Sequence, residues 1–336
     1  MKISKKIARK FVFPAMINLG FEKRLRQLSG TSILNLMYHG VVPLSNPSFS
    51  PRHISSEQFE QHLKYFIQDF EILSLPEAFE NYRNNIKTKR KALTISFDDG
   101  YKNNLNYALP LLEKYNIKTT FFISGVCAEE MEVRTLWSDM IACLSYFFRN
   151  EIIEIENFCF VNTFDKSAKL NISDFIKTLM PSDRERVLAM LINKYGLNDK
   201  LKQIPSTYWE LMNKEDIQKL AFSGIAAVGS HGYLHYNLGI IGKSESASEM
   251  KKSKELLEGA LNRNIDMIAY PDGSYTNEVK DQAEELGYDK QLAVNYKCND
   301  DFTDKRILNR HGLSSTTTFE SNMFFLNKSF LSKGYN

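Results

Sequence analysis

The feature that most constrains the fold is a series of short, almost wholly apolar segments that alternate with helical patterns. The apolar segments lie at residues 33–37, 93–97, 119–123, 225–229, 267–270 and 292–294, and helical patterns lie at 105–115, 246–262 and 277–286. Ser55 opens a further helix with Gln58 three residues on, which is the spacing of a capping box. Strands that are apolar throughout are typical of parallel sheets covered on both faces. The pattern therefore predicts an α/β fold, either a barrel or a doubly wound sheet.

This alternation stops between residues 126 and 220. The segment contains Trp137, Trp209, a Phe147–Phe148 pair and charges of mixed sign. We predict a largely helical insertion between two strands of the sheet, placed to form a lid or a wall for the substrate.

Composition narrows the classes of function. The chain has 336 residues, of which 43% are hydrophobic, and this content is typical of a globular protein rather than a disordered one. Its net charge is only +3, whereas a nucleic-acid-binding domain usually concentrates basic residues on one face. Nucleic acid is therefore not an expected partner.

Residues 1–30 form a basic N-terminal segment before the main domain at 31–336. Ile3, Ile7 and Phe11 are four residues apart among several lysines and arginines, which predicts an amphipathic helix. Two interpretations stay open: peripheral attachment of residues 1–25 to a membrane, or packing on the domain itself. The apolar stretch at residues 11–21 is too short to span a bilayer and has no evident cleavage site. We expect a cytoplasmic location, including the inner face of the membrane.

Two acidic residues follow one of the apolar segments directly. Asp98, Asp99 and Gly100 come after the strand predicted at 93–97. Functional groups gather where the strands of a parallel sheet end. A bend at Gly100 would bring both carboxylates to this edge, so that one can bind a cation while the other accepts a proton.

Two histidines follow another apolar segment. His231 and His235 are four residues apart, and we predict that they share one face of a helical turn and reach the same ion. Together with one aspartate they give three protein ligands and leave positions open, as in a catalytic zinc site. Water bound to such an ion becomes acidic and nucleophilic near neutral pH.

With these motifs the chain resembles the polysaccharide deacetylases that carry the NodB-homology domain, carbohydrate esterase family 4. Residues 96–100 (Ser-Phe-Asp-Asp-Gly) and 231–235 (His-Gly-Tyr-Leu-His) stand for the family's first two motifs. The resemblance implies a distorted (β/α) barrel, Asp98 as general base, and Asp99, His231 and His235 as metal ligands. Zinc is the expected ion, and Co²⁺, Ni²⁺ or Fe²⁺ fit the same ligands.

The other motifs match less completely. Tyr270, Pro271 and Asp272 stand in place of the third motif, in which the resemblance implies a backbone N–H for the oxyanion, but the arginine of that motif is absent. Arg310, in a late strand, is expected to replace it beside Asp98. Tyr101 is expected to line the site.

The resemblance implies that a histidine acts as the general acid. The Tyr-His pair at residues 38–39 resembles circularly permuted members, in which this histidine is the acid, so His39 is favoured over His311. His53 and His62 are expected at the surface.

The predicted function is metal-dependent removal of N-acetyl groups from an amino-sugar-containing polysaccharide or glycan precursor. Two alternatives stay open: an O-acetyl esterase on the same scaffold, and a non-catalytic domain that binds a glycan or a protein partner. The missing arginine of the third motif favours the non-catalytic alternative, and the intact carboxylates and histidines favour catalysis.

Overall fold

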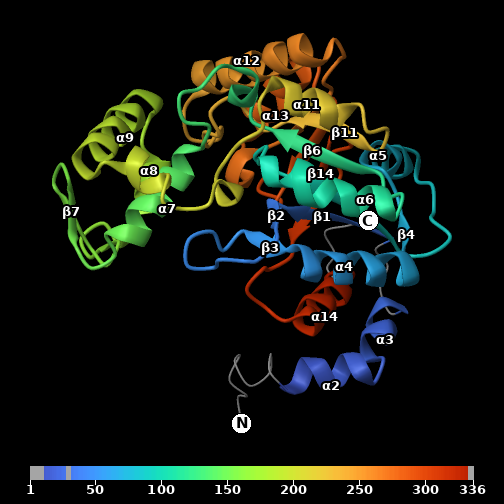
Figure 1. Ribbon diagram of the computed structural model, residues 1–336. Helices are drawn as coiled ribbons and strands as arrows, with labels where there is room; N and C mark the ends of the chain where they lie inside the picture. Colours follow the sequence, from blue (N-terminus) through green and yellow to red (C-terminus); the bar gives the residue numbers. More distant parts are fainter. Residues whose placement is uncertain (1–10, 28–31, 332–336) are drawn as a thin grey trace.

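The computed structural model describes residues 11–27 and 32–331 (Figure 1). Its centre is a closed barrel of seven parallel strands, which confirms the predicted α/β barrel and excludes the doubly wound sheet. In order around the barrel the strands are β1 (Ile33–Tyr38), β14 (Ile307–Gly312), β13 (Lys290–Ala293), β12 (Met267–Ala269), β11 (Ala226–Ser230), β6 (Thr119–Ile123) and β5 (Ala92–Phe97).

The barrel closes because β1 pairs with both β14 and β5. A short strand, β4 (Glu71–Ile72), pairs with β5 outside this ring. After β1 the chain forms a separate parallel pair, β2 (Gly40–Val42) and β3 (His53–Ser55). The barrel strands are buried along almost their whole length, as their apolar sequences predict.

Helices cover the outside of the barrel. They are α4 (Ser56–Asp69), α5 (Leu75–Asn84), the π-helix η2 (Asn104–Ala108) running into α6 (Leu109–Lys114), α11 (Lys214–Ala221), α12 (Lys243–Leu261), α13 (Asn277–Glu285) and α14 (Phe319–Ser329). The Ser55 side chain accepts a hydrogen bond from the Gln58 N–H at 3.2 Å and so begins α4. The Gln58 side chain donates instead to the Thr317 carbonyl oxygen, so the predicted capping box is only half formed.

The N-terminal region packs on the last helix. Helices α2 (Phe13–Asn18) and α3 (Phe21–Gln27) lie beside α14, and the ring of Phe13 stacks on that of Phe324 with centroids 4.4 Å apart. The predicted amphipathic helix begins in residues 1–10, which lie outside the described residues. Among the described helices, none is long and apolar enough to cross a membrane.

A second body projects from the barrel between β6 and β11 (Figure 1). It contains α7 (Trp137–Phe147), the antiparallel strands β7 (Ile152–Ile155), β8 (Phe158–Val161), β9 (Phe164–Asp165) and β10 (Leu170–Asn171), then α8 (Ile172–Thr178), α9 (Pro181–Tyr195) and α10 (Leu197–Leu201). We call residues 137–204 the insertion, because its apolar side chains form a core separate from that of the barrel. The sequence did not predict its four-stranded sheet, and α11, within the predicted range, packs on β11 and α12 of the barrel.

Candidate active site

The predicted site residues come together at one end of the barrel. Asp98 and Asp99 follow β5, His231 and His235 follow β11, and His39 follows β1. The strands are parallel, so their carboxyl ends meet at the same rim. Side chains separated by more than a hundred residues therefore face one cavity, as functional groups do in α/β barrels.

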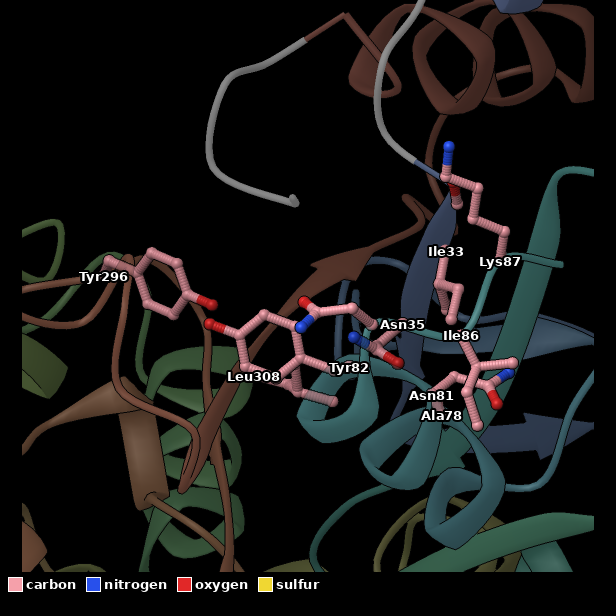
Figure 2. Close-up of a pocket in the computed structure, with 11 residues that line it drawn as sticks. Ile33, Asn35, Ala78, Asn81, Tyr82, Ile86, Lys87, Tyr296 and Leu308 are labelled. Carbon is pink, nitrogen blue, oxygen red and sulfur yellow. The ribbon is translucent and has the colours of Figure 1, made fainter.

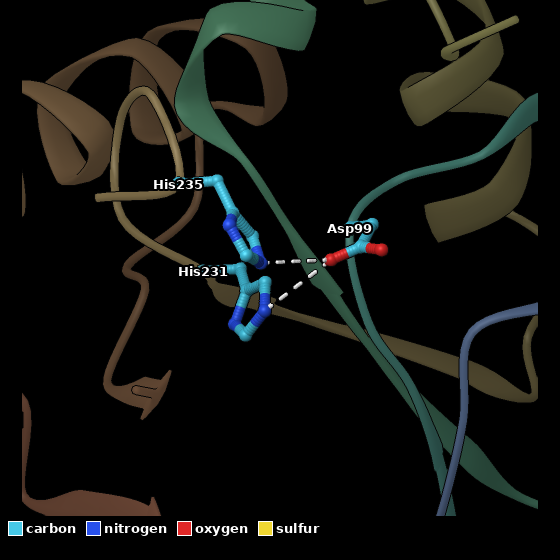
Figure 3. A group of neighbouring side chains, drawn as sticks. All are labelled: Asp99, His231 and His235. Carbon is cyan, nitrogen blue, oxygen red and sulfur yellow. Dashed lines mark ion pairs between the residues drawn. The ribbon is translucent and has the colours of Figure 1, made fainter. Parts of the chain in front are cut away.

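Asp99 and the two histidines form a compact cluster (Figure 3). Oδ1 of Asp99 lies 3.5 Å from Nε2 of His231 and 3.2 Å from Nε2 of His235. All three side chains are buried. Asp99 adopts a left-handed φ of 77° and Gly100 one of 97°, and this turn carries both carboxylates to the barrel mouth. The bend predicted at Gly100 thus includes Asp99 as well.

The histidines do not share a helical turn, and that part of the prediction is wrong. Residues 231–235 form a loop in which Gly232 has φ 71° and His235 has φ 57°. Left-handed residues interrupt a right-handed helix. The loop brings the rings together without helical periodicity, with ring centroids 4.9 Å apart.

The cluster has the donor set of a metal site. Nδ1 of His231 lies 2.8 Å from the Ala269 carbonyl oxygen, and a neutral ring that donates this hydrogen bond directs the lone pair of Nε2 toward Asp99. Both carboxylate oxygens of Asp99 are buried and have no hydrogen-bond partner among the described residues. Buried polar atoms are nearly always satisfied, so the missing hydrogen-bond partners of this carboxylate fit a site that a bound cation completes. Two imidazoles and one carboxylate are ligands that fit a divalent metal such as zinc.

Charge around the cluster favours the ionised carboxylate. Burial raises the pKa of Asp99, but its contacts with His231 and His235 outweigh burial and hold that pKa well below the usual range. Burial lowers the pKa of His235, and Asp99 more than compensates, so the net shift is upward.

Asp98 makes a buried two-point ion pair with Arg310. Nη1 of Arg310 lies 2.6 Å from Oδ1 and Nη2 lies 2.8 Å from Oδ2 of the carboxylate. Burial alone would raise the pKa of Asp98, but the charge of Arg310, followed by that of His231, gives a net lowering. Arg310 therefore lies beside Asp98, where it was predicted.

His231 and His235 of the cluster line a cavity of about 450 Å³ together with Asp98, whereas Asp99 is fully buried and not part of the lining. His39 lines this cavity, and burial lowers its pKa although Asp99 and Asp98 oppose the shift. Tyr270 and Asp272 also line it, as expected. Pro271 is buried nearby but is not part of the lining, and neither is His311, whose pKa is lowered by burial to about 4.

Tyr101 was expected to line the site, and the structure contradicts this. The side chain is fully buried and is not part of the cavity lining, and its hydroxyl donates to the carboxylate of Asp139 at 2.9 Å. His53 and His62 are likewise buried rather than exposed. His53 packs edge-on against the Tyr101 ring, and Nδ1 of His62 lies 2.9 Å from the hydroxyl of Tyr38. Aromatic neighbours from distant elements surround these rings, and local sequence does not show this.

Arg52 and Asp139 are site residues that the sequence did not reveal. Nη2 of Arg52 lies 2.8 Å from Oδ1 of Asp139, and Nη1 lies 3.9 Å from Oδ2 of Asp99. Burial raises the pKa of Asp139 to about 6, although Arg52 opposes that effect. The two residues are 87 positions apart in the chain, so no local motif marks the pair.

A second cavity, of about 250 Å³, lies at the opposite end of the barrel strands (Figure 2). Its lining includes Ile33 and Asn35 of β1, Leu308 of β14, and Asn81 and Tyr82 of α5. Among the described residues that line it, none is a carboxylate or a histidine. It therefore lacks the carboxylates and imidazoles that hold a divalent metal, although Lys87 and two tyrosines line it.

Comparisons with known proteins agree with the motifs. The sequence profile described as polysaccharide deacetylase matches residues 85–150 and 154–290, more than half of the chain. The chain is 23% identical to the protein YxkH of Bacillus subtilis (strain 168) over 254 residues, and these cover 75% of this chain and 61% of YxkH. This chain thus matches less than two thirds of the length of that relative.

Two solved structures share the fold. IcaB from Ammonifex degensii aligns with a TM-score of 0.58 at 18% identity and covers 89% of this chain and 98% of its own. The deacetylase PplD of Streptococcus pyogenes aligns with a TM-score of 0.54 at 18% identity and covers 86% of this chain and 95% of its own. The matched profile shows that the chain belongs to the polysaccharide deacetylase family, hydrolases that act on amide bonds.

Proposed function

We propose that this protein is a metal-dependent deacetylase that removes N-acetyl groups from the amino sugars of a glycan, with zinc as its metal. One observation carries the proposal. The Asp98 carboxylate, held by Arg310, lines the cavity, and beside it lie two imidazoles and the buried Asp99 carboxylate, whose oxygens have no hydrogen-bond partner among the described residues.

Asp99, His231 and His235 are the residues that would hold the ion. When bound, the ion would polarise the acetamide carbonyl and make water acidic enough to attack near neutral pH. The nearby Asp98 carboxylate lies 3.8 Å from Nε2 of His231, so the general base and the ligands share one face of the cavity.

Asp98 accepts the proton of the attacking water. Its bidentate contact with Arg310 fixes the orientation of the carboxylate and keeps it ionised, which a general base requires. Arg310 thus supplies from β14 the arginine that is absent from the third motif.

His39 supplies the proton for the leaving group. The oxygen of water adds to the carbonyl carbon while Asp98 takes the proton of the water, and the carbon–nitrogen bond breaks. His39, in its protonated form, protonates the sugar nitrogen, so that acetic acid and a free amine leave. Asp98 then releases its proton to solvent, and His39 takes one up again. The backbone N–H of Asp272, at the rim after β12, is proposed to stabilise the negative charge that develops on the carbonyl oxygen.

The test is release of acetate from N-acetylglucosamine oligomers, with and without a chelator, by the wild-type protein and by Asp99→Asn. We expect release that stops with the chelator, returns with Zn²⁺, and is absent in the variant although it folds. Release from O-acetylated but not N-acetylated sugars would point to the esterase alternative. Binding of the oligomers without any release, in metal-loaded protein, would favour a non-catalytic domain.

A further inference from the structure

The insertion forms part of the wall of the active-site cavity. Besides residues at the barrel mouth, the cavity is lined by Trp137, Ser138, Ile141 and Ser145 on one face of α7, and by Lys177 on α8. The shape of the space open to a substrate therefore depends on where the insertion contacts the barrel rim.

The first contact lies beside β1, in the loop between β2 and β3. Arg52 of this loop pairs with Asp139 of α7 at 2.8 Å. The ring of Phe49, from the same loop, belongs to the core of the insertion and meets the ring of Tyr146 edge-on at 5.9 Å.

The second contact lies beside β11, at His235 of the cluster and at the next residue along the chain. The indole N–H of Trp137 donates to the carbonyl oxygen of His235 at 3.2 Å. The guanidinium of Arg184 lies between two rings, 5.0 Å from that of Trp137 and 4.5 Å from that of Tyr236.

The third contact lies beside β12. Nζ of Lys177 forms an ion pair with Oδ1 of Asp272 at 2.7 Å, and both side chains remain partly exposed. This pair joins α8 of the insertion to the loop after β12, and both of its residues line the cavity.

The order of strands shows which part of the barrel rim the insertion contacts. From β1 the ring runs through β5, β6 and β11 to β12, and the insertion leaves the chain within this arc and contacts the rim at both of its ends. Only the rim at β13 and β14 lies outside the arc. The contacts of the insertion thus leave the side of β13 and β14 without a wall from this body. A cavity open on that side alone admits a chain end, whereas an internal segment of a polymer needs a groove that is open at two ends.

From this geometry we infer that the site takes a chain end or a very short glycan and deacetylates its terminal sugar. The inference rests on the proposed function and specifies its substrate. A volume of about 450 Å³ is that of a pocket for a small molecule. Apolar side chains and hydroxyls of α7 face this volume, and these suit an uncharged sugar ring.

The experiment maps the position of deacetylation by mass spectrometry on end-labelled N-acetylglucosamine oligomers, from the monosaccharide to the hexamer. Wild-type protein is expected to deacetylate one terminal sugar, with kcat/KM that does not rise beyond the disaccharide. Lys177→Ala removes the ion pair with Asp272 and should raise deacetylation of internal sugars by about tenfold. Lys202→Ala is the control, because Lys202 also forms an ion pair in the insertion, a more exposed one with Asp199, and neither residue lines the cavity.

A binding measurement separates this inference from the proposed function. The Asp98→Asn variant is titrated with oligomers whose two ends are both blocked by bulky groups, and with the same oligomers unblocked. Binding of the unblocked oligomers alone supports entry by a chain end, even if no acetate is released. Equal binding of blocked oligomers, deacetylation of internal sugars by wild-type protein, or no binding of any oligomer would overturn the inference.

Discussion

The two ends of the barrel are built from the same strands but differ in how their polar groups are satisfied. At the amino end, the buried amide of Asn35 donates to the Asn309 carbonyl oxygen at 3.0 Å and accepts from the Thr94 hydroxyl at 2.8 Å. At the carboxyl end, both oxygens of Asp99 and Nδ1 of His235 are buried without hydrogen-bond partners among the described residues. Unsatisfied buried groups lower stability, and folded proteins retain them mainly where a ligand or reaction uses them.

The cavities differ in the same way. The amino-end cavity offers amides, tyrosines, one lysine and apolar side chains, whereas the carboxyl-end cavity offers carboxylates, imidazoles and a paired arginine. The comparison indicates that the amino end stabilises the barrel and the carboxyl end carries the chemistry, as is general for α/β barrels.

The largest effect is expected from Asp98→Asn. An amide cannot accept the proton of the attacking water, so acetate release should fall by roughly 10²–10⁴-fold or more. Acetate assays on zinc-loaded protein measure this loss, and circular dichroism checks the fold. Activity close to wild type would show that another group is the base.

The next effect separates the two candidate acids. His39→Gln should lower kcat by about 10²-fold, because the leaving amine loses its proton donor. His311→Gln should leave kcat unchanged, because His311 does not line the cavity. The reverse ranking of the two variants would move the acid to β14.

Arg310→Met should lower both stability and activity. It leaves the buried carboxylate of Asp98 without its partner, which costs about 3–5 kcal/mol of the free energy of unfolding when a buried ion pair is broken. Arg310→Lys keeps the charge and should recover part of both losses. Urea unfolding and acetate assays measure the two quantities, and a fully stable Arg310→Met would contradict the account of this pair.

Stability at low pH should also depend on His62, whose ring contacts the hydroxyl of Tyr38 at the carboxyl end of β1. Burial lowers the pKa of His62 from 6.5 to about 3. Between these values the unfolded chain binds a proton that the folded ring does not. Stability should therefore fall as the pH drops below 6.5, by about 1.4 kcal/mol per pH unit from this group, with no effect above 6.5.

The matched variant is His62→Gln, which cannot take up the proton. Urea unfolding of both proteins at several pH values should show a shallower loss of stability in the variant. Identical slopes would mean that the folded protein accommodates a charged His62.

The smallest effect is expected at the amino end. Asn81→Ala, in the lining of that cavity, should leave acetate release unchanged and alter the free energy of unfolding by no more than about 0.5 kcal/mol. A large loss of acetate release in this variant would show that the two ends of the barrel are not functionally separate.

The barrel could be predicted because six of its seven strands contain an apolar segment of their own, whereas β14 includes Asn309, Arg310 and His311. Strands buried on both faces are apolar throughout, and polar residues directly after them mark the carboxyl rim, which is how Asp98, His231 and His39 were found. The strands of the insertion gave no such signal, because β9 and β10 have only two residues each and β7 alternates between exposed and buried positions.

What local sequence could not show is which distant side chains meet. Arg52 lies in a loop and Asp139 in a helix, and only the folded insertion brings them together. Tyr101 is two residues after Asp99, but its side chain is buried outside the cavity lining, where its hydroxyl donates to Asp139. The histidine spacing predicted the partners correctly but not the backbone, since Gly232 and His235 are left-handed.

The most direct test of the central claim is a zinc titration of the metal-free protein, with bound metal and acetate release from N-acetylglucosamine oligomers measured on the same samples. The account predicts that release rises in proportion to bound zinc and reaches its maximum at one ion per chain. Full release by metal-free protein, or saturation with zinc without any release from N-acetylated or O-acetylated sugars, would contradict it.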